Sequence, residues 1–348
     1  MMRLDPITAE RLRRFRGISR GWWSAVILVA LILLSLVAEL FVNSRALVVH
    51  YEGEYYFPTY GAVIPGDTFG EAYQYETNYK LLAKRFAAEN SDNWVVMPLI
   101  PFDPFEINVY DGEFAPHPPS IERGHYLGTD VAGRDVAARL IYGFRIAIWF
   151  SLALLVSTYV IGIVLGCLMG YRGGWFDLVI QRLIEIWSNV PFLYIIMIVA
   201  SIVTPDFGML VFLMVLFGWM GMTWYMRTAT YKEVSRDYVM AAKALGASDW
   251  RIITQHILPN TISVIVTFIP FAVAGGITAL TALDYLGFGL PPPTPSWGEL
   301  LKQGTDRLDA PWVVTSVVSG LVLILVMVTF VGEAIREAFD PRRLTRYE

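Results

Sequence analysis

Six long apolar runs divide the chain, and polar or mixed segments separate them. The runs occupy residues 22–42, 146–169, 182–203, 209–226, 261–283 and 313–334. A helix needs about 20 mostly apolar residues to cross the hydrocarbon core of a bilayer, and these runs are close to that length. We therefore predict an all-α membrane protein with six transmembrane helices.

Residues 43–142, between the first two runs, are polar, aromatic and rich in proline. β-forming residues mixed with turn residues over 51–60 predict strands, and residues 78–89 are typical of a helix. The segment holds 14 acidic against 7 basic residues. We expect a small folded module outside the cytoplasm. It serves either as a docking surface for a partner or as a cap over the membrane part, and the sequence leaves both open.

A short amphipathic stretch precedes the second apolar run. Its apolar positions lie opposite its charged ones: Val136, Leu140, Ile141 and Phe144 against Arg134, Asp135 and Arg139. This division is typical of a helix that lies at the membrane surface, and we predict a short helix of that kind here.

Three glycines recur every four residues toward the end of the second run, at Gly162, Gly166 and Gly170, the last directly after it. Small residues at a spacing of four allow two helices to approach closely in lipid. The stripe predicts a helix-packing face. Packing within this chain and packing on a second chain are equally compatible with it.

Residues 238–260 form a polar, helix-rich segment between the fourth and fifth runs. Helical spacing places Tyr238, Ala241, Ala242 and Leu245 on one face. Gly246 follows directly, where a helix ends in a left-handed cap. We predict a helix, a sharp turn at this glycine and a second helix.

The second helix has its own start and stop signals. Ser248 can cap its first turn. Trp250, Ile253 and Ile257 are expected to share one side, and Pro259 is expected to limit how far the helix continues.

Composition agrees with a membrane class, because 55% of the 348 residues are hydrophobic and only 17% are charged. Lysine and arginine concentrate in both tails, in the turn between the second and third runs and in residues 227–251, which together hold 17 of the 27. The positive-inside rule then places both termini in the cytoplasm. The one cysteine, Cys167, lies within an apolar run and is expected to be a packing residue.

Candidate chemistry is sparse. The central portions of the apolar runs contain no charged residue that could serve as an ion relay. No G-x4-G-K-[S/T] phosphate loop occurs, and His50, His117 and His125 lack metal-ligand spacing. We expect no catalytic residue, no metal, no cofactor and no nucleic-acid partner, so that energy for any transport comes from another subunit.

Residues 238–260 resemble the EAA loop of the membrane subunits of ATP-binding-cassette importers, E-A-A-x3-G-x9-I-x-L-P. Ala241, Ala242, Gly246, Leu258 and Pro259 match the pattern. The chain departs from it twice, with Met240 in place of Glu and His256 in place of Ile. In that family the loop docks on the ATPase, and the first departure puts one polar contact to the ATPase in doubt.

The segment from Gly124 to Arg145 and the loop of residues 284–312 resemble the dipeptide and oligopeptide branch of these permeases, in its C-type subunit. Residues 51–57, the long insert and the spelling HILPN at 256–260 narrow the resemblance to the second permease of the Yej peptide importers, which in that family admit peptides such as microcin C.

The resemblance implies the type I importer permease fold in a bacterial inner membrane, with a long extracytoplasmic insert between helices 1 and 2. It implies a second permease subunit in a heterodimer, a cytoplasmic ATPase that binds the ATP, a periplasmic peptide-binding protein and surrounding lipid. The expected ATPase-coupling residues are Tyr238, Met240, Ala241, Ala242, Leu245, Gly246, Ala247, Leu258 and Pro259.

We accordingly divide the chain into five parts: a cytoplasmic tail (1–21), helix 1 (22–42), a periplasmic insert (43–142), the permease domain (143–337, with the EAA-like loop at 236–260) and a cytoplasmic tail (338–348). Two other classes remain open. One is an ion-coupled secondary transporter of small solutes, and the other is a membrane-anchored enzyme whose activity lies in the insert.

Overall fold

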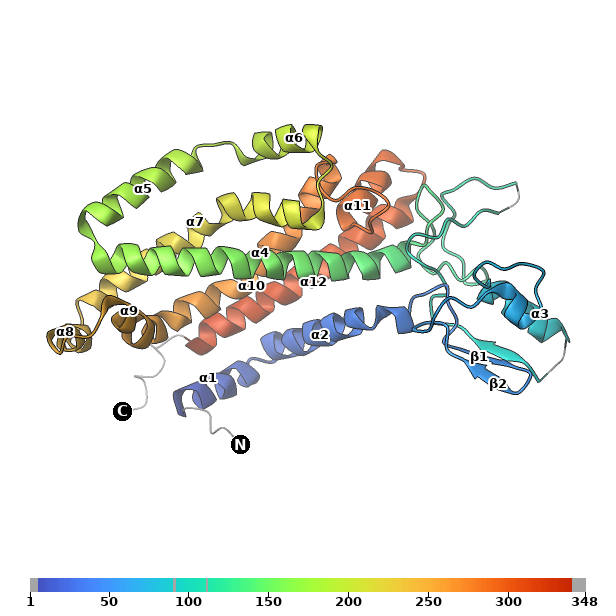
Figure 1. Ribbon diagram of the computed structural model, residues 1–348, viewed down its shortest axis with the longest axis horizontal. Helices are drawn as coiled ribbons and strands as arrows, with labels where there is room; N and C mark the ends of the chain where they lie inside the picture. Colours follow the sequence, from blue (N-terminus) through green and yellow to red (C-terminus); the bar gives the residue numbers. More distant parts are fainter. Residues whose placement is uncertain (1–5, 90–91, 111, 340–348) are drawn as a thin grey trace.

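Long apolar helices dominate the computed structural model, which describes residues 6–89, 92–110 and 112–339 (Figure 1). Within these ranges five helical segments are long and apolar enough to cross a membrane: α2 (Ser19–Leu36), α4 (Val136–Arg172), α7 (Phe207–Val234), α9 to α10 (Asp249–Leu286) and α12 (Pro311–Phe339). A bent pair of helices supplies a sixth segment. The prediction of an all-α membrane architecture is confirmed.

The bent pair corresponds to the third apolar run, for which the sequence predicted one continuous helix. The structure instead has α5 (Gly174–Ser188) and α6 (Phe192–Ile202), which meet at 64°. Pro191 lacks an N–H group and disfavours helical geometry in the residue before it, so the helix stops there. The Trp187 indole donates to the Leu216 carbonyl of α7 over 2.9 Å, which fixes the break against that helix.

The short surface helix predicted before the second apolar run is wrong. Helix α4 begins at Val136 and continues without interruption to Arg172, with Asp135 accepting from the Ala138 N–H as its cap. Arg134, Asp135 and Arg139 are buried rather than exposed. They are buried because other parts of the fold cover them and supply counter-charges, which the local pattern does not reveal.

Helices α4 and α7 pack along the glycine stripe of α4, within one chain. A Cβ atom built on Gly162 would lie 2.8 Å from Met222 Cβ, and one on Gly170 would lie 2.7 Å from Thr230 Cβ. A Cβ atom on Gly166 would lie 2.6 Å from the Thr223 carbonyl oxygen, as close as one on Gly170 would lie to the Arg227 carbonyl oxygen. Glycine lets the two backbones come this close.

We expect Gly166→Val to disrupt this packing. Three side-chain carbons cannot fit at 2.6 Å from a backbone oxygen, so the helices must separate and lose packing over several turns. Overpacking of this kind costs about 1–3 kcal/mol or more. The purified variant should unfold at a lower temperature than wild type in a fluorescence thermal scan. Gly320→Val in α12, where nothing lies within 4 Å of the added carbon, is the matched control, and equal shifts in both variants would contradict the assignment.

The insert contains a small sheet and one helix. Strands β1 (Val48–Tyr51), β2 (Glu54–Tyr56) and β3 (Trp94–Val96) are antiparallel in the order β2-β1-β3. Helix α3 (Tyr79–Glu89) buries Leu82 and Phe86 against the sheet in a core separate from the membrane part. The strands predicted near 51–60 and the helix predicted over 78–89 are both present. Strand β3 was missed because its partner lies more than forty residues earlier.

Figure 1 shows the insert beyond one end of the helix bundle and helices α8 (Asp237–Ala244) and α9 (Asp249–Ile252) at the other end. Helix α1 (Pro6–Gly17) and the last turn of α12 also lie at the α8–α9 end, where Arg20 pairs with Glu333 over 3.2 Å. Helix α11 (Trp297–Asp306) covers the bundle at the insert end, and its Trp297 donates to the Leu140 carbonyl of α4. The chain also contains two short 3-10 helices, η1 (Ala38–Leu40) and η2 (Gly66–Phe69).

Candidate functional site

The segment between α7 and α10 forms a bent elbow, which we define as residues 237–257. Its first helix, α8 (Asp237–Ala244), ends two residues before Gly246, whose φ of +78° lies in the left-handed region. The Ala247 N–H donates to the Ala242 carbonyl and the Gly246 N–H to the Lys243 carbonyl, each over 3.1 Å. These two bonds close the helix end in the geometry that favours glycine. The turn predicted at Gly246 is therefore present.

The second arm of the elbow starts as predicted. Ser248 precedes α9 (Asp249–Ile252) and its hydroxyl accepts from the Arg251 N–H. A hydroxyl in this position satisfies one of the free N–H groups at a helix start. Two residues at the end of α4 contact Asp249 in this first turn. The Tyr171 hydroxyl donates to the Asp249 carboxylate over 3.2 Å, and the Arg172 guanidinium lies 3.8 Å from the same carboxylate.

The helix does not stop at Pro259, so that expectation is wrong. A π-helical turn, η3 (Ile253–Ile257), follows α9, and α10 (Leu258–Leu286) continues directly from it. The Leu258 N–H donates to the Ile253 carbonyl, five residues back. Pro259 lies in the first turn of α10, where its missing N–H does not interrupt the helix. One continuous helical segment therefore joins the elbow to the membrane-spanning part.

A buried apolar cluster anchors the elbow to the bundle. Val239, Ile252, Ile253 and Ile257 pack with residues of α4 and α7: Cys167, Met222 and Met226. Trp250 does not share this side, because it is 61% exposed and Ile252 takes the buried position. The π-helical turn changes the angular spacing of the segment, and the α-helical pattern could not anticipate that.

An apolar tip is left at the outer edge of the elbow. It comprises Tyr238, Met240, Ala241, Leu245 and Trp250, all of them exposed. Leu245 is 88% exposed and Met240 is 53% exposed. The Tyr238 hydroxyl bonds to Glu233 at 2.6 Å, and burial together with this carboxylate raises the pKa of Tyr238 to about 12. The phenol is neutral at physiological pH, so none of these five side chains carries a charge.

The other residues expected to contact the ATPase differ in exposure. Gly246 and Pro259 are exposed, whereas Ala242, Ala247 and Leu258 pack partly into the buried cluster. Trp250 joins the tip although the sequence reading assigned it to the buried side. Trp250 lies two residues after the capping Ser248, in the first turn of α9, and no local signal marked it as exposed.

A buried ionic cluster lies at the opposite end of the bundle, between the end of the insert and α11. Arg134 bonds to Asp130 at 2.7 Å and to Glu299 at 2.8 Å. Arg139, which has no exposed side-chain surface, also contacts Glu299 and donates to the Pro104 carbonyl over 3.0 Å. This network therefore joins residues that are 160 or more positions apart in the sequence, and no local pattern could reveal it.

Two histidines that are separated in sequence meet beside this cluster. His125 bonds to Asp135 at 2.7 Å and to the Tyr110 hydroxyl at 2.9 Å. The His117 ring lies against the same tyrosine ring at a centroid distance of 5.0 Å, and burial lowers the pKa of His117. Over the described ranges, no group of three histidine, cysteine or carboxylate side chains is placed to hold a metal ion. These histidines support the fold of the loop.

Known proteins resemble this chain over different lengths. The family described as "Binding-protein-dependent transport system inner membrane component" matches residues 162–345. The "Inner membrane ABC transporter permease protein YejE" of Escherichia coli (strain K12) is 42% identical over 343 residues, covering 99% of each chain. The "Peptidoglycan transport system permease protein YejE" of Agrobacterium fabrum is 38% identical over 98% of this chain and 95% of the relative.

A more distant relative covers part of the chain. The "Oligopeptide transport system permease protein OppC" of Lactococcus lactis subsp. lactis is 34% identical over 69% of this chain and 82% of the relative. A solved chain from the MetNI methionine ABC transporter, in inward-facing conformations, matches with a TM-score of 0.47 and 16% identity. It covers 58% of this chain and 96% of that one, and this likeness is too weak to carry an argument.

Proposed function

Since the chain belongs to the family of binding-protein-dependent transport system inner membrane components, we propose that it forms half of the transmembrane pathway of a peptide importer and couples it to a separate ATPase through the elbow. Its full-length relatives are permease proteins of ABC transport systems, and this chain is likewise a multi-pass inner-membrane permease subunit rather than an ATPase. The observation that carries the coupling proposal is the apolar tip, whose supporting arm continues into α10.

The tip has the properties of a protein-binding surface. It is exposed and apolar, while the buried cluster beneath it holds its backbone in place. Large apolar side chains that are already ordered lose little entropy when a partner covers them. Force applied by an ATPase at the tip would pass through α9 and η3 to α10, because packed helices move as rigid bodies.

Three partners complete the proposed importer: a second permease subunit in a heterodimer, a cytoplasmic ATPase and a periplasmic peptide-binding protein. The concentration of lysine and arginine at the elbow end supports an orientation with both termini in the cytoplasm. Peptides are the proposed cargo because an oligopeptide permease aligns with most of this chain and because the central portions of the spans are uncharged.

The insert supplies a candidate surface for the binding protein. A cavity of about 740 Å³ in the insert is lined in part by Leu81, Ile107, Val109 and Ile121. These four side chains are exposed. Exposed apolar clusters of this kind mark interaction sites in soluble modules. Under this proposal the insert docks the periplasmic partner.

The coupling proposal is tested by Leu245→Asp at the tip. The side chain is 88% exposed, so the change leaves the fold intact, but it brings a charge into the proposed interface. Removing an interface anchor typically costs about 2 kcal/mol or more, which corresponds to at least a 30-fold loss of affinity. Titration of the ATPase subunit onto the purified permease pair should register this loss.

Leu308→Asp is the matched control, since Leu308 is 81% exposed in the turn between α11 and α12, at the insert end. This variant should bind the ATPase as wild type does. Unchanged binding in Leu245→Asp, or equal losses in both variants, would remove the tip from the proposed interface.

A further inference from the structure

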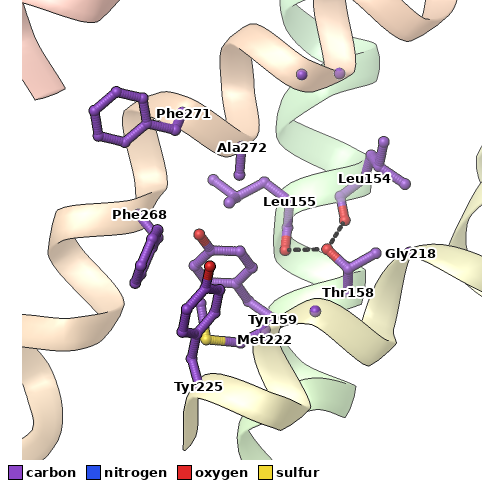
Figure 2. Close-up of a pocket in the computed structure, with 13 residues that line it drawn as sticks. Leu154, Leu155, Thr158, Tyr159, Gly218, Met222, Tyr225, Phe268, Phe271 and Ala272 are labelled. Atoms are coloured by element: carbon purple, nitrogen blue, oxygen red, sulfur yellow. Dashed lines mark hydrogen bonds between the residues drawn. The ribbon is translucent and has the colours of Figure 1, made fainter. Parts of the chain in front are cut away.

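A cavity of about 300 Å³ lies midway along the bundle, between α4, α7 and α10 (Figure 2). Its walls combine aromatic rings with bare backbone: Tyr159, Tyr225, Phe268, Gly218, Gly221 and Gly275. No charged side chain contributes to its lining. Figure 2 shows the rings of Tyr159, Tyr225 and Phe268 gathered near one another.

The free polar groups of the cavity are two phenols. The Thr158 hydroxyl is already bonded to the Leu154 carbonyl of its own helix at 2.7 Å. The Tyr159 and Tyr225 hydroxyls, by contrast, have no hydrogen-bond partner among the described residues. A hydroxyl left unpaired in hydrocarbon costs several kcal/mol. Tyr225 is 48% exposed, so its surroundings in the membrane must supply a polar partner. We take these hydroxyls to line a polar route rather than to face lipid.

The cavity continues toward the elbow. A second cavity of about 580 Å³ shares Tyr225 and Phe268 with the first and reaches Lys232, Glu233 and Asn260 at its far end. The two shared rings stack, with centroids 4.1 Å apart and planes 25° apart. Charge therefore enters the lining only beyond this aromatic junction, at the end where the tip lies.

We propose that Tyr159 and Tyr225 hydrogen-bond the main chain of the transported peptide at this junction, an inference that rests on the proposed peptide-import function. A peptide main chain offers an N–H donor and a carbonyl acceptor at every residue, and phenols can satisfy either. Gly221 and Gly275 in the lining have nothing within 4 Å of an added Cβ atom, which leaves room for side chains of different sizes. This combination recognises what all peptides share and does not select for charge.

The test uses the assembled importer in liposomes with its ATPase and binding protein. The probes are trialanine and its analogue N-methylated at the central peptide bond. Tyr159→Phe and Tyr225→Phe remove only the hydroxyl. Each should raise KM for trialanine about fivefold, since one neutral hydrogen bond contributes about 1 kcal/mol. Discrimination against the N-methylated analogue should also shrink, and a merely structural change would not produce that effect.

Tyr194→Phe is the control, because Tyr194 is an exposed phenol on α6 that lines neither cavity. It should leave both KM values unchanged. If the wild-type importer transports trialanine and both phenylalanine variants behave as it does, the inference is overturned while the proposed function stands. Failure of the wild-type importer to transport any peptide removes the proposed function and the inference together.

A second measurement identifies the occupant directly. A photoreactive benzoylphenylalanine at position 268 should cross-link to labelled trialanine during turnover. Capture of a lipid or of the second permease subunit, or no capture of the peptide, would overturn the inference, because the cavity would then be a lipid-facing groove or a subunit contact.

Discussion

Glu299→Ala should lower the free energy of unfolding by about 3 kcal/mol or more, because it leaves Arg139 buried without its main counter-charge. The Arg139 side chain has no exposed surface, and Arg134 loses the same partner. Asp130 stays nearby but lies 3.5 Å from Arg139 and already bonds to Arg134. A thermal scan of the purified permease should show an early transition, and limited proteolysis should cut near the junction of the insert with α4.

Asp309→Ala, in the turn that follows α11, provides the comparison. Asp309 pairs with Arg307 at 2.8 Å, but both side chains are largely exposed. Exposed pairs contribute at most about 1 kcal/mol, so this variant should unfold close to wild type. If both alanine variants behave alike, the buried cluster does not hold the insert end of the bundle together. Glu299→Gln, which keeps the acceptor oxygen and loses the charge, should lie between the two.

Gly246→Val is the second large effect, and it should abolish transport and transport-stimulated ATP hydrolysis. The backbone at Gly246 has φ of +78°, which costs a β-branched residue about 1–2 kcal/mol or more. A Cβ atom there meets nothing within 4 Å, so the effect comes from the backbone and not from a clash. The chain should relieve this strain by reshaping the turn, which misdirects Leu245 and Met240 while the buried cluster keeps the membrane part folded.

Gly246→Asn separates the backbone requirement from the loss of glycine itself. Asparagine is enriched in left-handed conformations, so this variant should retain most of the transport rate. Membrane insertion should be normal for both variants, as judged by their yield and elution in size-exclusion chromatography. Full transport by Gly246→Val would mean that the geometry of the elbow is not required for coupling.

The sequence by itself determined the class of this protein and the shape of its most distinctive segment. Apolar runs of about 20 residues specify membrane helices wherever they occur, since lipid leaves the backbone few other ways to satisfy its hydrogen bonds. The turn at Gly246 and the cap at Ser248 were equally readable, because each depends on a few neighbouring residues. The helix α3 and the first hairpin of the insert were found for the same reason.

Tertiary structure alone decided the features that depend on distant partners. The local pattern predicted Arg134 and Arg139 at a membrane surface. In the fold both are buried and pair with Glu299, which lies far along the chain. The glycine stripe had two possible partners until α7 of the same chain was found against it. Helix continuity through Pro259 also depended on packing, since the π-helical turn is anchored by α4 and α7. Local signals fix local geometry, whereas burial and charge pairing are decided by whichever residues the fold brings together.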